Sequence, residues 1–219
     1  MAKKKRKSPA KKTESKKGKN KYVNSMLRFS RVFVVDFIET AAVTLAIALV
    51  IYLFIASPHV VVGESMMPNF VNGEYLFTNK LALTYSNPNM GQVIVFQHTP
   101  QQEYIKRVIG VPGDTLELEN GNVYINGKLL NESAYIPKGV KTYGFSYLAN
   151  NVKITIPKGE YFVMGDNREN SSDSRFWGLV PRNEIRGIAT FVFWPLNKFG
   201  FVPSITYTTK GNVIYSKAN

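Results

Sequence analysis

Ser65 and Lys106 have side chains that can act together as a nucleophile and its base. Ser65 lies two residues after Gly63, which permits tight backbone geometry. Lys106 lies in the run Tyr104–Val111, where both faces of an extended strand are apolar apart from one base each. A buried lysine has a lowered pKa, and its neutral amine can take a proton from a hydroxyl. Arg107, on the other face, cannot lose its proton in a protein, so chemistry favours Lys106 as the base.

Both segments also have a purely structural interpretation. A serine in a turn flanked by Gly63 and Pro68 is usually only a turn residue. Lysine is common on exposed edge strands, where it points into solvent. Local composition alone therefore does not decide between a catalytic and a structural role for Ser65 and Lys106.

A third polar segment, Met164–Val180, interleaves acids, arginines and serines. Such a mixture predicts charge-assisted hydrogen bonds that hold a rigid loop. The alternatives are a polar surface loop and a divalent-cation loop. The segment lacks the carboxylate pattern of an EF-hand, and its two arginines, Arg168 and Arg175, oppose cation binding.

The composition excludes several other kinds of site. The 219 residues include no cysteine, which excludes a disulfide scaffold, a thiol nucleophile and a Cys-based metal site. The two histidines, His59 and His98, are too few for a His-rich metal site. The net charge of +13 lies almost entirely in residues 1–31, so we expect no nucleic-acid-binding surface on the folded part. The opening KKKRK resembles a nuclear localisation patch, but the apolar segment that follows disfavours that interpretation.

An apolar segment follows the basic residues. No Asp, Glu, Lys or Arg occurs between Glu39 and Glu64, and Val32–Ala56 is long enough to cross a bilayer as a helix. A cleaved signal peptide and a buried core helix are the alternatives. The C-terminal end of the segment lacks a clear A-x-A cleavage site, which disfavours a cleaved signal peptide. The basic residues before the segment disfavour a core helix. The positive-inside rule then predicts a cytoplasmic N-terminus and an extracytoplasmic C-terminal part.

These patterns predict three parts: a basic disordered tail over 1–31, a transmembrane helix over 32–56, and an extracytoplasmic domain over 57–219. Turn signals divide the domain into short apolar or alternating runs. Asn120-Gly121 is a strong hairpin signal, and Pro112-Gly113 suits a type II turn. We therefore predict a mainly β fold, with antiparallel sheets forming a barrel-like catalytic body and a smaller inserted lobe over 115–159. The expected strands are Tyr75–Phe77, Val93–Gln97, Tyr104–Val111, Thr115–Leu118, Val123–Ile125, Val152–Ile156, Tyr161–Met164 and Ile188–Trp194.

Taken in order after a basic tail and an apolar span, the three polar segments resemble those of bacterial type I signal peptidases. The resemblance is closest to the short, single-span kind typical of Gram-positive bacteria. It runs from about Val32 to Phe201. The motifs that carry it are GESMMP at 63–68, YIKRVIG at 104–110 followed by PGD at 112–114, and GDNR at 165–168 with NS at 170–171 and DSR at 173–175.

The resemblance implies roles for individual residues. It makes Ser65 the nucleophile and Lys106 its general base, and it makes Ser171 the residue that hydrogen-bonds and orients the lysine. It makes Asp173 and Arg175 a supporting pair, with Asp166 and Arg168 holding the loop. It also implies that no metal or cofactor is required. Because Gly63 replaces the Ser or Thr of some members, the oxyanion hole would use backbone N–H groups, notably that of Ser65.

The substrates implied by the resemblance are secretory preproteins with small residues at the first and third positions before the scissile bond. We expect the preprotein to bind as an added β-strand, with its small side chains in apolar pockets. The candidate pocket residues are Val61, Val62, Met66, Tyr104 and Ile105. The implied location is the cell membrane, with the lipid bilayer and the secretion channel as further partners. The cluster of Phe193, Trp194, Phe199 and Phe201 has two interpretations, membrane anchor or protein core.

Three rival functions remain open at this point. The self-cleaving repressors also use Ser and Lys, but they are soluble and carry a DNA-binding segment. A Ser-His-Asp hydrolase would use His98 or His59, neither of which lies in a recognisable motif. A non-catalytic, membrane-anchored chaperone or assembly factor is the third rival, and such proteins are said to lack the catalytic lysine.

Overall fold

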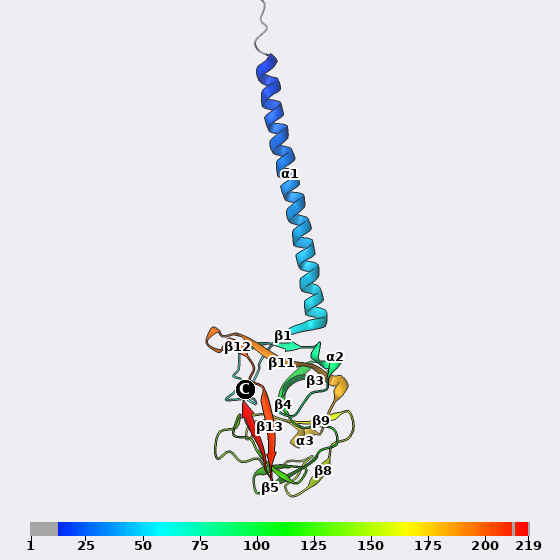
Figure 1. Cartoon of the computed structure of the whole chain (residues 1–219), viewed down its shortest axis with the longest axis vertical. Helices are drawn as coiled ribbons and strands as arrows, with labels where there is room; N and C mark the ends of the chain where they lie inside the picture. Colours follow the sequence, from blue (N-terminus) through cyan, green and yellow to red (C-terminus); the bar gives the residue numbers. More distant parts are fainter. Residues whose placement is uncertain (1–12, 212, 219) are drawn as a thin grey trace, which may run out of the picture. The chain divides into compact units, whose positions relative to one another are not determined.

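The computed structural model describes residues 13–211 and 213–218. These residues form a helical unit up to Ile51 and a β-rich unit from Tyr52 onward (Figure 1). Each unit is described by itself below. The β-rich unit carries all of the candidate chemistry.

The helical unit contains one long helix, α1, which runs from Thr13 to Val50 and continues as a π-helical turn over Ile51–Ile55. Its 19 residues from Val32 to Val50 are long and apolar enough to cross a membrane, and their side chains are exposed. The helical conformation ends at Ile55, one residue before the predicted boundary at Ala56.

Residues 13–31, which the sequence assigned to a basic tail, are part of α1 in the structure. Lysine and arginine have high helix propensity, and the apolar helix that follows removes the cost of a new nucleus. Residues 1–12 of that predicted tail lie outside the described part of the chain.

The larger of two sheets forms the body of the β-rich unit, in the order β1-β2-β11-β3-β4-β9-β10, with β12 beside β11. All of its pairings are antiparallel. The described strands form an open path that does not close into a barrel. Its strands are Ala56–Val60 (β1), Tyr75–Asn79 (β2), Val93–Thr99 (β3), Gln102–Gly110 (β4), Glu160–Met164 (β9), Val180–Pro181 (β10), Ile185–Trp194 (β11) and Gly200–Phe201 (β12).

The second sheet forms the predicted lobe, but it has an additional component. Its order is β13-β14-β7-β6-β5-β8, and the C-terminal hairpin joins the lobe through a parallel pairing of β14 with β7. Figure 1 shows β5, β8 and the end of this hairpin away from β1 and β12. The strands are Thr115–Glu119 (β5), Asn122–Ile125 (β6), Lys128–Asn131 (β7), Lys153–Thr155 (β8), Ile205–Lys210 (β13) and Val213–Ala218 (β14).

The mainly β fold and all eight expected strands are confirmed. Asn120 and Gly121 have φ of 51° and 75°, the positive values that a type I′ hairpin requires. The helices in the β-rich unit are short: Ala82–Tyr85 (α2), Ser174–Trp177 (α3) and the 3₁₀ turns Arg182–Glu184 (η2) and Leu196–Lys198 (η3).

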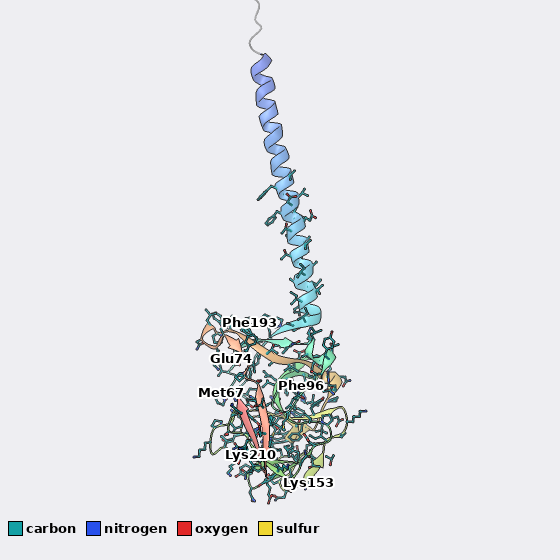
Figure 2. The ribbon with its side chains drawn as sticks, in the orientation of Figure 1. Met67, Glu74, Phe96, Lys153, Phe193 and Lys210 are labelled. Carbon is teal, nitrogen blue, oxygen red and sulfur yellow. The ribbon has the colours of Figure 1, made fainter. Side chains whose placement is uncertain are left out.

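Strand β4 lies inside the body, and both of its faces are covered by packed side chains. Val108 packs into a core cluster with Ile94 and Val163, and the next residue, Ile109, packs into a different cluster with Leu116 and residues of the lobe. Figure 2 shows Phe96 inside the body, while Lys153 lies toward the lobe end. Burial on both sides fixes the register of β4, and with it the direction of each basic side chain.

Candidate active site

The structure brings Ser65 and Lys106 together. Lys106 Nζ lies 2.7 Å from Ser65 Oγ and 3.0 Å from the carbonyl oxygen of Ile105. Lys106 is only 4% exposed, and its ammonium lies 5.2 Å from the centre of the Tyr104 ring. A short hydrogen bond between a hydroxyl and an amine is the geometry in which the amine can take the proton.

Burial also changes the acidity of the lysine. Loss of solvation lowers the pKa of Lys106 from its ordinary value of 10.5 to about 8, against the opposing effect of the Asp173 and Asp166 carboxylates. A substantial fraction of Lys106 is therefore neutral near physiological pH. That fraction is the form that a general base needs.

Ser65 lies in a turn held by its own backbone and by the loop after β9. Gly63 has a φ of +91°, which disfavours other residues, and its N–H donates to Asn72 Oδ1 at 2.9 Å. The Ser65 carbonyl accepts a 3.0 Å hydrogen bond from the Asn167 N–H. The side-chain amide of Asn167 donates to the carbonyl of Glu64. The loop therefore fixes the position of the nucleophile through main-chain contacts.

Gly165, at the start of this loop, lies directly beside Ser65. A Cβ atom at position 165 would lie 2.4 Å from the Ser65 carbonyl oxygen and 2.2 Å from Ser171 Oγ, so only glycine fits. The Gly165 N–H donates to Asp173 Oδ2 at 3.1 Å, and its carbonyl accepts from Arg168 Nε at 3.0 Å. Both of its peptide groups are thus held by buried charged side chains.

Asp166 forms a buried ion pair with the second base of β4. Arg107 Nε and Nη2 donate to the two Asp166 oxygens at 2.8 and 2.6 Å, and Asn69 Nδ2 donates to the same carboxylate. Arg107 Nη1 donates to the carbonyl of Gly91. Alternation along β4 did not distinguish its two bases, and chemistry favoured Lys106 as the partner of Ser65. The structure assigns Lys106 to Ser65 and Arg107 to Asp166.

Two further buried ion pairs hold the loop. Asp173 accepts a bidentate pair of hydrogen bonds from Arg175, both at 2.8 Å, and it also caps the N-terminus of α3. Arg168 donates to both oxygens of Glu132, which lies at the end of β7 in the lobe. The loop is therefore connected to both sheets.

Ser171 lies in this cluster, but it does not make the hydrogen bond that the resemblance implies. Its side chain is buried, and among the described residues its Oγ has no hydrogen-bond partner. Its side chain lies beside Gly165, where an added Cβ atom would meet it. The expected bond from Ser171 to Lys106 is thus absent, since Lys106 is engaged by Ser65 and Ile105 instead.

Ser65 and Lys106 lie at a groove of about 740 Å³. Four of the five predicted pocket residues line it: Val61, Val62, Tyr104 and Ile105. Met66 does not, because its side chain is 1% exposed and packs in the core with Phe70 and Leu76. Consecutive residues of a turn point in different directions, and sequence adjacency to Ser65 was therefore a poor guide at this position.

Neither histidine contacts Ser65. His98 stacks on Tyr104, with ring centres 4.5 Å apart, and packs against Trp177. His59 contacts Thr78 and Glu103. In the part of the chain that the structure describes, no three His, Asp or Glu side chains are arranged to hold a metal ion.

Asn69 and Glu132, the partners of Asp166 and Arg168, were not predicted from the sequence. Both are far from the loop in sequence and belong to no motif considered above. A buried arginine requires an acid, so the two loop arginines implied a further carboxylate. Nothing in the sequence identified Glu132 as that residue.

The chain is similar to several known proteins. Residues 34–194 match the family model described as signal peptidase, peptidase S26. Signal peptidase IB of Staphylococcus aureus (strain COL) is 36% identical over 76% of this chain and 92% of its own length. The probable signal peptidase I-1 of Synechocystis sp. is 35% identical over 83% of this chain and 93% of its own.

A solved structure of a signal peptidase I from Enterococcus faecalis V583 also matches, with 32% identity. The match covers 47% of this chain and 97% of that chain, with a TM-score of 0.38. The family assignment rests on the family model and the two sequence relatives. The chain belongs to the bacterial type I signal peptidases of peptidase family S26, serine hydrolases that remove signal peptides.

Proposed function

We propose that this protein removes signal peptides from secretory preproteins with a Ser65–Lys106 dyad, through an acyl-enzyme. The observation that carries the proposal is the 2.7 Å contact between Lys106 Nζ and Ser65 Oγ in a buried position. The lowered pKa of Lys106, about 8, supports its role as a base near neutral pH.

The reaction proceeds in two stages. Neutral Lys106 takes the proton of Ser65 Oγ, and the oxygen attacks the scissile carbonyl carbon. The scissile C–N bond then breaks, and the new N-terminal amine of the mature protein leaves with a proton from the Lys106 ammonium. An ester between Ser65 and the signal peptide remains. Water, deprotonated by Lys106, attacks this ester and releases the signal peptide with a free carboxylate, and the Lys106 ammonium returns its proton to the departing Ser65 Oγ.

The developing oxyanion requires hydrogen-bond donors. The N–H of Ser65 makes no backbone hydrogen bond among the described residues, so it can donate to that oxygen. One such donor contributes about 3–4 kcal/mol to transition-state stabilisation. A glycine at position 63 supplies no hydroxyl, so the remaining donors are main-chain groups or water.

The substrate lies in the groove as an added β-strand. Strand β9 pairs with β4 only from Arg107 onward, so the stretch of β4 before Lys106 has a free edge. Strand β1 pairs with β2 on one side only. A peptide between the two edges can form main-chain hydrogen bonds with either of them. The apolar side chains of Val61 and Ile105 in this groove suit small apolar residues such as alanine.

The catalytic domain contacts the outer surface of the bilayer through the aromatic edge, defined as Trp194, Phe199 and Phe201. These side chains are 52%, 61% and 83% exposed, which argues against a role in the core. Phe193, the residue before Trp194, instead packs its ring on those of Phe77 and Tyr75. Figure 2 shows Phe193 and Glu74 at the end of the body opposite Lys153. The helix over Val32–Val50 anchors the chain, with its basic N-terminal side in the cytoplasm.

Covalent trapping tests the dyad directly. Detergent-solubilised full-length protein is mixed with a preprotein, quenched in acid within milliseconds to seconds, and analysed by intact mass and peptide mapping. We expect an adduct of signal-peptide mass on Ser65 that is absent from Ser65→Ala. An adduct on another residue, or cleavage by Ser65→Ala at the wild-type rate, would contradict the proposal.

A further inference from the structure

A second side-chain contact joins the two walls of the groove. His59 Nδ1, on β1, lies 3.1 Å from Glu103 Oε2, on β4. Both residues line the same groove as Ser65 and Lys106. The mechanism above uses neither of them. The groove therefore has the catalytic contact at one position and an imidazole–carboxylate contact at another.

The distance between the two contacts sets how many substrate residues separate the scissile bond from Glu103. Glu103 precedes Lys106 by three residues on one strand, which is about 10 Å at roughly 3.3 Å per residue. An extended substrate covers that distance with about three residues. The apolar lining residues Val61 and Ile105 lie between the two contacts in sequence. A substrate whose first three side chains before the scissile bond occupy the apolar part would therefore reach Glu103 at about the fourth residue.

The His59–Glu103 contact presents a negative charge at this position of the groove. A carboxylate only accepts hydrogen bonds, so the proton on His59 Nδ1 donates to Glu103. His59 Nε2 lies 3.0 Å from Thr78 Oγ1, whose single proton can go to this nitrogen or to the Ser57 carbonyl oxygen at 3.4 Å. A neutral imidazole satisfies both nitrogens when the Thr78 hydroxyl donates to Nε2, the shorter of its two contacts. The Glu103 side chain is 44% exposed, and its charge is accessible to a bound peptide.

The charges around His59 support the neutral form. The charged groups that face it are Glu103 on β4 and Lys80, which follows β2. Burial lowers the pKa of His59 and Lys80 lowers it further, while Glu103 raises it, and the net direction is downward. Near pH 7 the contact therefore carries the single negative charge of Glu103.

We propose that His59 and Glu103 form a charge-selective subsite for the substrate residue about four positions before the scissile bond. Glu103 is the specificity determinant, which favours a basic residue and disfavours an acidic one, and His59 positions its carboxylate. This inference rests on the proposed function and extends it to a position outside the small-residue pockets.

The experiment compares preprotein-derived peptides that differ only in carrying Lys, Gln or Glu at the fourth residue before the scissile bond. A second set varies the fifth residue. Detergent-solubilised full-length enzyme is used, and kcat/KM is measured for each peptide. The ratio of Lys to Glu peptide is taken within one preparation, so differences in the amount of folded protein cancel.

For one of the two positions we expect a wild-type ratio of about two to five, typical of a partly exposed charge pair. Glu103→Gln should bring the ratio to about one, and Glu103→Lys should reverse it. Glu119→Gln, at an exposed acid of the lobe, is the matched control and should keep the wild-type ratio. Lowering the pH until His59 is protonated should reduce the ratio in wild type but not in His59→Gln.

Equal kcat/KM values for the Lys and Glu peptides in wild type, at both positions, would overturn the inference. So would an unchanged ratio in Glu103→Gln. A wild-type enzyme that cuts none of the peptides would overturn the proposed function as well, and the two failures are therefore distinguishable.

Discussion

Lys106 Nζ lies between two oxygen atoms, Ser65 Oγ at 2.7 Å and the Ile105 carbonyl oxygen at 3.0 Å. The carbonyl only accepts, so it takes one N–H of the lysine. When the amine is neutral, its lone pair can accept the Ser65 O–H instead of donating to it. The same geometry therefore serves the amine before proton transfer and the ammonium after it.

The first prediction concerns pH. Since burial lowers the pKa of Lys106 to about 8, the fraction of neutral amine rises as the pH increases through that value. We expect kcat/KM for preprotein cleavage to rise about tenfold per pH unit below 8 and to level off above it. A rising limb near the ordinary lysine value of 10.5, or near that of a histidine, would contradict the assignment of the base.

The second prediction concerns the contact between Gly165 and Ser65. The added methyl group of Gly165→Ala would meet the Ser65 carbonyl oxygen and Ser171 Oγ at less than 2.5 Å. We expect displacement of the nucleophile and a loss of about 100-fold in kcat/KM. Gly200→Ala is the matched control, because no atom lies within 4 Å of its added Cβ. Near-wild-type activity of Gly165→Ala would show that the loop does not position Ser65.

The third prediction concerns the buried pair of Arg107 and Asp166. Asp166→Asn removes the charge that compensates a buried guanidinium, so we expect a loss of about 3–5 kcal/mol in the free energy of unfolding. Urea unfolding in detergent, followed by far-UV circular dichroism, measures this loss. The exposed-acid variant Glu119→Gln should change the value by less than about 0.5 kcal/mol. An equally small effect of Asp166→Asn would rule out this pair as a major support of the loop.

The fourth prediction concerns the aromatic edge. The chain has two tryptophans, the exposed Trp194 and the half-buried Trp177, which packs against Phe96. In vesicles with brominated acyl chains, we expect quenching of the full-length protein's fluorescence to remain in Trp177→Phe and to disappear in Trp194→Phe. If quenching is instead absent from wild type, the aromatic edge does not reach the bilayer.

Much of the fold could be predicted from the sequence because strands and turns have local signals. The short continuous apolar run Tyr161–Met164 and the Asn120-Gly121 turn identify their elements without reference to the rest of the chain. The helical extension to Thr13 was missed because low apolar content was taken as disorder. The place of β13 and β14 in the lobe sheet was missed because strand partners across a long sequence separation have no local signal.

The residues of the candidate site also divide into those with a local sequence signal and those without one. Ser65 and Lys106 could be predicted as candidates because their segments combine suitable chemistry with a recognisable motif. Glu132 was missed because its role depends only on three-dimensional proximity to Arg168. Met66 was misplaced because a turn does not impose a regular direction on its side chains. Burial and partner choice are properties of the folded chain, and a single sequence does not contain them explicitly.

The most direct test of the central claim is cleavage of a preprotein by full-length wild type, Lys106→Ala and the exposed-lysine control Lys158→Ala, with the cut located by mass spectrometry. The account predicts that wild type and Lys158→Ala cut after a small residue at the signal-peptide junction, and that Lys106→Ala is slower by at least about 100-fold. Cleavage by Lys106→Ala at the wild-type rate would contradict the dyad, and absence of cleavage by all three would favour a non-catalytic assembly factor.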